Sequence, residues 1–257
     1  MLELNKIYNM DCVEGMKMLP DNYIDLTVTS PPYDNLRTYN GFEWDFETTA
    51  RELYRVTKQG GVVVWIVGDE TLKGSETGTS FKQALFFKEC GFNLHDTMIW
   101  LKNNPMPRDT RIPRYWQAFE YMFIFSKGKP QHFTFLREPS KTAGETRNFF
   151  SRNPDGTQRL DRKEKTKNHT VLETKPRTNV WLMGRVPNSE RTKHPAQFSE
   201  QLAKDHILSW SNEGDIVLDP FSGSGTTCKV AKELYRNYIG FEISKEYCDI
   251  AEQRICQ

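Results

Sequence analysis

Residues 216–227, Ile-Val-Leu-Asp-Pro-Phe-Ser-Gly-Ser-Gly-Thr-Thr, run from an apolar strand through a tight glycine turn into the start of a helix. This order allows a ligand to approach the backbone closely at a helix N-terminus. No Gly-Lys-Ser/Thr follows, so a Walker phosphate loop is excluded. A dinucleotide fingerprint has Gly or Ala where this chain has Cys228. The stretch predicts a cofactor site in an α/β sheet, and a purely structural turn is the alternative.

Two acidic residues flank the glycine turn. Asp219 ends the predicted strand Ile216–Asp219, and Glu242 lies 23 residues further on, near the end of the next predicted strand. That spacing suits a carboxylate that holds ribose hydroxyls. A carboxylate beside the turn disfavours a pyrophosphate and favours a cation, and S-adenosylmethionine carries a sulfonium and an ammonium group. The two acids argue against a purely structural turn and indicate S-adenosylmethionine as the cofactor.

A second motif, Thr29-Ser30-Pro31-Pro32-Tyr33, lies near the start of the chain. Apolar and polar residues alternate from Ile24 to Thr29, which predicts a strand. The two prolines stop a ladder or a helix because proline donates no backbone N–H and has a fixed φ. A rigid turn with a hydroxyl, bare carbonyls and an aromatic ring can hold a flat polar substrate. A simple strand terminator is the alternative interpretation.

Length and composition fit one large α/β domain with an insert, or two small domains. The chain has 257 residues, 37% of them hydrophobic, and a mean hydropathy of −0.69. It has no apolar run long enough to span a bilayer and no signal peptide at its start, so we expect a cytoplasmic protein without a membrane partner. The five cysteines form no CxxC pair, which argues against a disulfide framework or a zinc site, and no metal is expected.

Predicted helices and strands alternate along most of the chain, which favours a mainly parallel sheet with helices on both faces. Gly60-Gly61 is expected to end the helix that begins near Phe46, and Gly68 to Ser80 is expected to form a mobile loop. The next helix is expected to present one face made of Phe81, Ala84, Leu85 and Lys88. The other predicted elements are helices at 11–19, 199–210, 226–235 and 245–255 and strands at 62–67, 97–101, 119–126 and 238–243.

Charge is spread unevenly along the chain. Hydrophobic periodicity is lost from Gln131 to about Lys193, and the segment from Arg137 to Lys193 has a net charge of +7 against −6 for the remainder. This asymmetry suggests a polyanion partner for an insert, for which Arg162, Lys163 and Lys165 are candidate contacts. A solvated charged insert is the alternative.

The loop at residues 103–116 combines three prolines with arginine and aromatic residues. Arg108, Arg111 and Arg114 precede the pair Tyr115-Trp116. Arginine beside aromatic rings suits phosphate contact and base stacking, so the three arginines are candidate DNA contacts. An ordinary proline-rich surface loop is the alternative.

The two motifs together resemble the amino-DNA methyltransferases, and their order resembles the beta group of that family. The resemblance covers nearly the whole chain except Gln131 to Lys193. It implies a Rossmann-like methyltransferase sheet with a circularly permuted motif order. Residues 1–130 would form the catalytic half, 131–193 a target-recognition insert and 194–257 the cofactor-binding half.

The resemblance also implies roles for individual residues. Those implied around the methionine part of the cofactor are Asp219, Phe221, Gly223, Ser224, Gly225 and Thr226. Glu242 would hold the ribose of the cofactor. Asp11, beside Cys12, would accept a hydrogen bond from the amino group of the cofactor's adenine. His194 and Pro195, in His194-Pro195-Ala196-Gln197-Phe198, would close over the methionine end, although His194 could also be a plain surface histidine. Ser30, Pro31, Pro32 and Tyr33 would form the catalytic turn.

The expected reaction is methyl transfer from S-adenosylmethionine to the exocyclic amine of a base flipped out of double-stranded DNA. Within the family, Ser-Pro-Pro-Tyr is associated most often with cytosine N4, so cytosine N4 is favoured and adenine N6 is the alternative. An RNA or protein acceptor and an inactive nucleic-acid binder remain as further alternatives. A separate restriction endonuclease is a possible partner, and both a monomer and a homodimer are compatible with the sequence.

Overall fold

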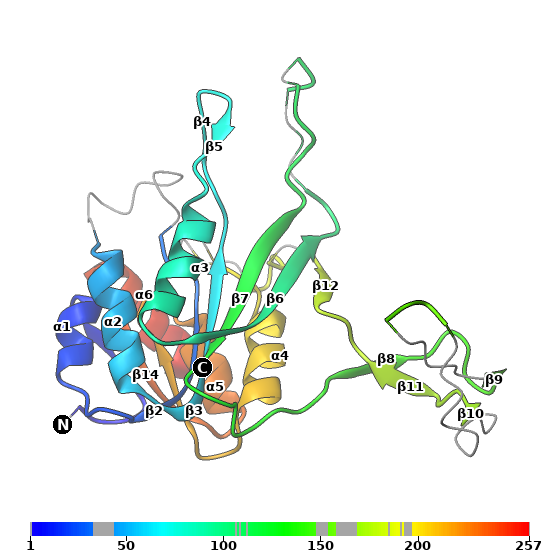
Figure 1. Ribbon diagram of the computed structural model, residues 1–257. Helices are drawn as coiled ribbons and strands as arrows, with labels where there is room; N and C mark the ends of the chain where they lie inside the picture. The colour runs from blue at the N-terminus through cyan, green and yellow to red at the C-terminus, as the bar shows by residue number, and fades with distance from the viewer. Residues whose placement is uncertain are drawn as a thin grey trace. The chain divides into compact units, whose positions relative to one another are not determined.

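The structure, a computed structural model, describes residues 2–32, 44–105, 107, 109–111, 113–147, 154–157, 169–184, 186–190, 192 and 197–256. It divides into two compact units, one formed by Met1–Thr134 with Asn179–Gln257 and the other by Phe135–Thr178. The larger unit contains the main sheet and the helices (Figure 1). No helix in the described ranges is long and apolar enough to cross a membrane.

The larger unit is built on an eight-stranded sheet. Its strands lie in the order β1 (Lys6–Asn9), β14 (Asn237–Glu242), β13 (Ile216–Asp219), β2 (Ile24–Thr29), β3 (Thr57–Val67), β7 (Phe119–Ser126), β6 (Asn93–Lys102) and β12 (Val180–Met183). Every neighbouring pair is parallel except the two pairs that contain β7. The expected α/β fold with a mainly parallel sheet is therefore confirmed. The carboxyl ends of all strands other than β7 lie along one edge of the sheet, which we call the carboxyl edge.

Helices cover both faces of this sheet. One layer consists of α1 (Cys12–Lys17), α2 (Phe46–Val56) and α3 (Thr79–Glu89), and the other of α4 (Glu200–Trp210), α5 (Thr226–Glu233) and α6 (Lys245–Cys256). Ser199 caps α4, as its sequence predicts, by accepting the N–H of Leu202 at 3.3 Å. The run from Val62 to Val67 is buried on both faces, as a central strand between two helical layers requires.

Aromatic packing fixes α3 against the sheet. Trp65 of β3 is fully buried, donates from Nε1 to Gln83 Oε1 at 2.9 Å and packs edge-on against Phe87 with centroids 5.0 Å apart. As a result, the buried face of α3 differs from the predicted face of Phe81, Ala84, Leu85 and Lys88, and the prediction of this face is wrong in part. Ala84 and Phe87 are buried, whereas Phe81 is 49% exposed and Leu85 is 60% exposed.

The prediction that Gly60-Gly61 ends α2 is wrong. α2 ends at Val56 because Thr57 is extended and its Oγ1 donates to a carbonyl one turn earlier at 2.6 Å. β3 then passes through both glycines, where its pairing with β2 shifts register. Gly60 has a φ of 83° and donates its N–H to Lys127 O at 2.6 Å. The glycines therefore serve an irregularity inside a strand rather than a helix end.

The segment from Gly68 to Ser80 is more regular than its composition suggests. It contains an antiparallel hairpin of β4 (Thr71–Leu72) and β5 (Ser75–Glu76), and α3 begins one residue before Ser80. Asp69 anchors the base of the hairpin by accepting the Ser80 N–H at 2.8 Å and the Ser80 hydroxyl at 2.6 Å. Strands of two residues give no detectable periodicity, so sequence patterns miss them.

The smaller unit contains two short antiparallel pairs among its described residues. β8 (Arg137–Pro139) pairs with β11 (Thr174–Pro176), and β9 (Thr146–Arg147) pairs with β10 (His169–Thr170). The unit Phe135–Thr178 contains 11 Lys and Arg residues against 6 Asp and Glu residues, a net charge of +5. The candidate contacts Arg162, Lys163 and Lys165 lie outside the described residues.

α1 packs so closely on β14 that residue 15 has no space for a side chain. A Cβ atom at Gly15 would lie 2.3 Å from Cε1 of the fully buried Phe241 ring. In an uncrowded helix Gly15→Ala would add about 1 kcal/mol of stability. Here we expect the overlap to reverse the sign and destabilise the protein by about 1–3 kcal/mol in urea unfolding. Gly184→Ala is the control, because its Cβ would lie 3.6 Å from the nearest atom. A Gly15→Ala protein as stable as the wild type would contradict this packing.

Candidate cofactor and catalytic site

A cavity opens at the carboxyl edge, beside the ends of β2, β13 and β14 and the start of α1. It encloses about 910 Å³ of empty space, part of which is open to solvent. That volume suits a ligand of nucleotide size. Both sequence motifs meet here, since the predicted site residues that line the cavity are Asp11, Cys12, Ser30, Pro32, Phe221, Gly223, Ser224, Thr226 and Glu242.

The Ser-Pro-Pro turn forms one wall of the cavity. Ser30 and Pro32 line it, and Pro31 is buried between them. The turn directly follows β2, whose last residue pairs with Trp65 of β3 in the middle of the sheet. The predicted aromatic residue of the motif, Tyr33, lies outside the described residues. The wall thus presents a hydroxyl on a backbone that two prolines hold rigid.

A buried hydrogen bond joins the Ser-Pro-Pro turn to the glycine turn. Thr29 Oγ1 donates to Asp219 Oδ1 at 2.7 Å, and the same oxygen accepts the N–H of Phe221 at 3.1 Å. Asp219 is 1% exposed and does not line the cavity, so it holds the two turns together from beneath. Burial raises the pKa of Asp219 to about 6.

The glycine turn is packed too tightly for other residues. Gly225 has a φ of 77°, and a Cβ there would lie 2.8 Å from the Ala251 Cβ on α6. On the neighbouring strand, a Cβ at Gly240 would lie 2.3 Å from Ser222 Oγ. The turn therefore rests directly on α6 and β14, and its backbone is left accessible from the cavity side.

Glu242 ends β14 and reaches back to the glycine turn. Its Oε2 accepts the Gly223 N–H at 2.8 Å, and its Oε1 accepts the Ser244 N–H at 2.8 Å. Burial raises the pKa of this carboxyl group. Each carboxylate oxygen has more than one acceptor site. Glu242 can therefore accept hydrogen bonds from two ligand hydroxyls while the two backbone bonds fix its orientation.

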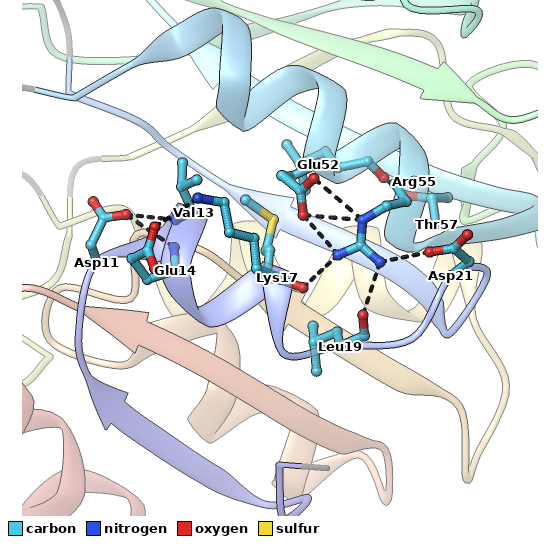
Figure 2. A network of polar contacts seen from close by, with 11 residues as sticks. Asp11, Val13, Glu14, Lys17, Leu19, Asp21, Glu52, Arg55 and Thr57 are labelled. Atoms are coloured by element: carbon cyan, nitrogen blue, oxygen red, sulfur yellow. Dashed lines mark hydrogen bonds and ion pairs between the residues drawn. The ribbon is translucent and has the colours of Figure 1, made fainter.

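Asp11 and Cys12, at the start of α1, also line the cavity. Asp11 caps α1 by accepting the N–H groups of Val13 at 2.8 Å and Glu14 at 3.2 Å (Figure 2). Cys12 is buried, with its Sγ 3.8 Å from Thr49 Oγ1. Burial raises the pKa of this thiol to about 12, so Cys12 stays neutral and is unsuited to act as a thiolate nucleophile.

Arg55 on α2 holds α1 and β2 in position (Figure 2). Its Nη2 donates to Met16 O at 2.7 Å and to Glu52 Oε2 at 2.7 Å. Its Nη1 donates to Leu19 O at 2.9 Å and to Asp21 Oδ1 at 2.7 Å. One guanidinium group thus satisfies carbonyls at the end of α1 and in the turn before β2, which are the two elements that carry Asp11 and the Ser-Pro-Pro turn.

Arg254 on α6 grips the glycine turn from behind. Its Nη1 donates to Ser224 O at 2.6 Å, to Ser224 Oγ at 3.0 Å and to Thr226 Oγ1 at 3.2 Å. Its Nη2 donates to Glu200 Oε1 at 2.8 Å, which also accepts from Lys229 Nζ at 2.7 Å. The Arg254 side chain is 12% exposed. Helices α4, α5 and α6 are therefore connected through polar contacts around the turn that lines the cavity.

The electrostatics of the cavity select for a cationic ligand. Its described lining carries the carboxylates of Asp11 and Glu242 and contains no Lys, Arg or His residue. A pyrophosphate would be repelled by this lining, whereas a sulfonium and an ammonium group would be attracted. S-adenosylmethionine fits the residues present, because Glu242 can hold its ribose and the glycine turn leaves its backbone accessible.

Some lining residues gave no signal in the sequence. Gln197 and Phe198 belong to the segment expected to close the cavity, but His194 and Pro195 of that segment lie outside the described residues. The lining residues that sequence reasoning missed include Met10, Trp44, Ile243, Ser244 and Tyr247. Ile243 and Ser244 could have been found because they directly follow Glu242. Trp44 could not, since it follows a segment without periodicity.

The candidate DNA contacts at residues 103–116 lie on a different part of the carboxyl edge. Arg111 is exposed and paired with Asp109, with its Nη2 2.5 Å from Oδ2. Arg114 donates to Glu76 Oε1 at 3.1 Å and to Gly74 O at 2.6 Å. Arg108 lies outside the described residues.

A mainly parallel sheet with an acidic cavity beside a tight glycine turn fits an S-adenosylmethionine-dependent methyltransferase, and the similarity to an M1.HpyAVI–SAM complex supports this class. A family model described as DNA methylase, N6_N4_Mtase, matches residues 24–253, and the chain belongs to this family. It is 55% identical over 249 residues to the orphan methyltransferase M.BamHII of Bacillus amyloliquefaciens, covering 91% of this chain and 89% of that protein.

Solved structures agree with this assignment. The structure of an M1.HpyAVI–SAM complex is similar with a TM-score of 0.65 and 28% identity, covering 98% of this chain and 99% of that chain. The cytosine-N4-specific PvuII DNA methyltransferase is similar with a TM-score of 0.70 over 96% of this chain and 85% of that chain, and its 20% identity supports the fold alone. The chain is an S-adenosylmethionine-dependent DNA methyltransferase.

Asp219 should make cofactor affinity depend on pH. Its pKa is raised to about 6, so the carboxylate is largely ionised above that pH and neutral below it. An ionised Asp219 attracts a cation bound nearby, so we expect S-adenosylmethionine affinity to fall as the pH decreases through about 6. Asp219→Asn keeps an acceptor for Thr29 and should show a shallower pH dependence in calorimetric titrations. An unchanged profile in this variant would exclude Asp219 as the titrating group.

Arg254 should act on cofactor binding more than on turnover. We expect Arg254→Met to raise KM for S-adenosylmethionine about ten-fold with little change in kcat, because the guanidinium contacts the back of the turn and not the cavity. Arg254→Lys should restore part of the affinity. Lys245→Met is the control, since Lys245 lies on the same helix and pairs only with Asp249 among its described contacts. Equal losses in kcat and affinity would contradict a role limited to positioning the turn.

Proposed function

We propose that this enzyme methylates N4 of cytosine, on a base flipped out of duplex DNA. The observation that carries the proposal is that Ser30 and Pro32 line the same cavity as the glycine turn and Glu242. A substrate amine held at the Ser-Pro-Pro turn would therefore lie beside the methyl donor. A base inside a duplex cannot reach a turn that lines a cavity, so flipping is required, at a cost of a few kcal/mol.

The exocyclic amine of a base is a weak nucleophile because its lone pair is delocalised into the ring. Two acceptors for the amine hydrogens would localise that lone pair and direct it at the methyl group. Ser30 Oγ and the carbonyl of Pro31 are the candidates for these acceptors. The fixed φ of proline keeps the turn rigid without further ordering during the reaction.

S-adenosylmethionine, when bound, supplies a methyl group activated by its sulfonium charge. The chain's own contribution is positioning: Glu242 and the glycine turn place the donor, and the Ser-Pro-Pro turn places the amine. Tyr33 is proposed to stack on the flipped base. Methyl transfer leaves a positive charge on the methylated nitrogen, and the proton that this nitrogen then loses passes to solvent.

We further propose that the segment 131–193 recognises the target sequence. Its core is the compact unit Phe135–Thr178, whose net charge of +5 suits contact with DNA phosphates. The preceding residues 1–130 would supply the catalytic turn, and residues 194–257 the cofactor-binding turn.

Adenine N6 is the second candidate acceptor. The matching family model covers both amines by its name, N6_N4_Mtase. Cytosine is favoured because the acceptor residue of the turn is a serine, which the family associates with cytosine N4. A neutral hydroxyl is a weaker proton acceptor than a carboxylate. The amines of cytosine and adenine carry similar charge before methyl transfer, so this difference gives little preference for either base.

The test is to methylate unmodified genomic DNA with the purified enzyme, digest it to nucleosides and identify the product by mass spectrometry. We expect N4-methylcytosine. N6-methyladenine would replace the cytosine assignment, and label transfer to RNA or protein but not to DNA would overturn the proposal as a whole.

Ser30→Ala should abolish methyl transfer while the affinity for S-adenosylmethionine stays within about two-fold of the wild type. The expected loss of about 10²–10⁴ in kcat reflects removal of an acceptor in contact with the amine. Radioactive methyl transfer and cofactor titration measure the two effects separately. Thr48→Ala, in the first turn of α2 and outside the cavity lining, is the control for the effects of preparing a variant. Wild-type turnover in Ser30→Ala would remove Ser30 from the mechanism.

A further inference from the structure

The β4–β5 hairpin is a surface feature that the cofactor site does not explain. β2, β3 and β6 are parallel, and the hairpin follows the carboxyl end of β3, just as the Ser-Pro-Pro turn follows β2. The connection from β6 to β7, residues 103–118, leaves the same edge. Figure 1 shows the hairpin and this connection projecting from the carboxyl edge of the sheet. Any macromolecule that delivers a base to Ser30 must approach this edge.

Arg114 fastens the hairpin to the β6–β7 connection. Its Nη1 donates to Glu76 Oε1 at 3.1 Å, and its Nη2 donates to the carbonyl of Gly74 at the hairpin tip at 2.6 Å. The Arg114 side chain is 27% exposed, so the contact is partly shielded from solvent. The two projections consequently form one connected element, which we call the two-loop clamp and define as residues 71–76 with 113–117.

The tip of the hairpin has a residue that its geometry does not favour. Lys73 and Gly74 occupy the two central positions of the turn with φ values of 48° and 83°. A two-residue turn with positive φ at both positions prefers Asn-Gly, Asp-Gly or Gly-Gly, and a lysine there is strained. Among the described residues, Lys73 forms no hydrogen bond or ion pair, and it is exposed. An Asn at this position would stabilise the turn better, so the lysine is not explained by folding.

The connection presents an aromatic side chain beside this lysine-bearing hairpin. Tyr115 is 100% exposed, and Trp116 is 46% exposed. Both directly follow Arg114, which anchors the connection to the hairpin. The connection thus carries an exposed aromatic ring, and the hairpin that Arg114 joins to it carries an exposed ammonium group. This pair of groups matches the chemistry of nucleic acid, where bases stack on rings and phosphates attract cations.

We propose that the two-loop clamp is a second DNA-contacting element, separate from the insert at 131–193, in which Lys73 contacts a phosphate and Tyr115 stacks on a base near the flipped one. This inference rests on the proposed DNA methylation and specifies which surface beside the cavity meets the duplex. Insertion of a ring into the stack would also compensate part of the free energy needed to extrude the target base.

Lys73→Asn is the decisive variant, because it removes the charge while it introduces a residue that the turn prefers. We expect a more stable or unchanged protein that binds a fluorescein-labelled duplex of random sequence about five-fold more weakly. The slope of log K against log salt should fall in magnitude by about 0.9, the contribution of one phosphate contact. Lys129→Asn is the matched control, since Lys129 is exposed after β7, at the opposite edge of the sheet. Equal affinity and slope in Lys73→Asn and the wild type would overturn the phosphate contact.

Tyr115→Ala tests the stacking role. We expect weaker extrusion of the target base, read as a smaller fluorescence increase of 2-aminopurine placed at the methylated position, and a lower kcat with an unchanged affinity for S-adenosylmethionine. Tyr235→Ala is the aromatic control, because Tyr235 is 76% exposed between α5 and β14, away from the carboxyl edge. Wild-type fluorescence and kcat in Tyr115→Ala would overturn the stacking contact.

Glu76→Ala separates fastening from simple electrostatics. Removal of a negative charge near DNA should strengthen binding if charge alone matters. If the clamp must be fastened through Arg114, binding should instead weaken by about two- to five-fold, and tighter binding would contradict the fastening.

The wild-type enzyme provides the reference in every assay. A wild type that methylates DNA while all three variants match it would refute the clamp alone, whereas a wild type inactive on DNA would refute the proposed function.

Discussion

The bond from Thr29 Oγ1 to Asp219 Oδ1 is the contact on which the site depends. It connects the last residue of β2 with the last residue of β13, at the positions from which the Ser-Pro-Pro turn and the glycine turn depart. A hydrogen bond to a charged group contributes about 1.5–3 kcal/mol. Its loss would leave Asp219 Oδ1 with the N–H of Phe221 and would remove the link to β2. The Ser-Pro-Pro turn and the glycine turn follow residues that are 190 positions apart in the chain, and this bond holds the two turns next to each other.

Burial of Asp219 has an electrostatic consequence as well as a structural one. Desolvation favours the neutral acid, whereas the N–H of Phe221 and the hydroxyl of Thr29 favour the carboxylate, and the pKa of about 6 reflects both effects. A cation in the cavity above adds to the second group of interactions. Asp219 can thus join the two turns in the empty protein and also strengthen the binding of a positively charged cofactor. The cofactor provides a positive charge near Asp219 that the described lining of the cavity does not contain.

The sequence predicts the central elements of this fold because their signals are local. Ile24–Thr29 alternates apolar and polar residues, Val62–Val67 is a continuous apolar run, Ser199 is a typical cap, and Glu242 lies at the spacing a ribose-binding acid needs. The missed features depend on tertiary contacts. The edge strand β1 lies near the start of the chain, before the first predicted helix, and β12 lies in the segment 131–193, where hydrophobic periodicity is lost. The face of α3 is set by Trp65 and Phe87, and the grip of Arg254 on Ser224 joins residues 30 positions apart.

The distribution of polar contacts also explains how one edge can serve both a small cofactor and a large substrate. Two guanidinium groups near the cavity donate to backbone carbonyls. Arg55 donates to Met16 O at the end of α1, and Arg254 donates to Ser224 O in the glycine turn. Neither lines the cavity, so the lining keeps its negative character. Cationic side chains that could meet phosphate lie instead on the projections beyond β3 and β6 and in the basic unit. Cations in the cavity lining would repel the sulfonium. On the projections, the carboxylates of Glu76 and Asp109 are paired with Arg114 and Arg111, which offsets their repulsion of DNA phosphates. The cavity lining can therefore stay negative while the projections beside it approach a polyanion.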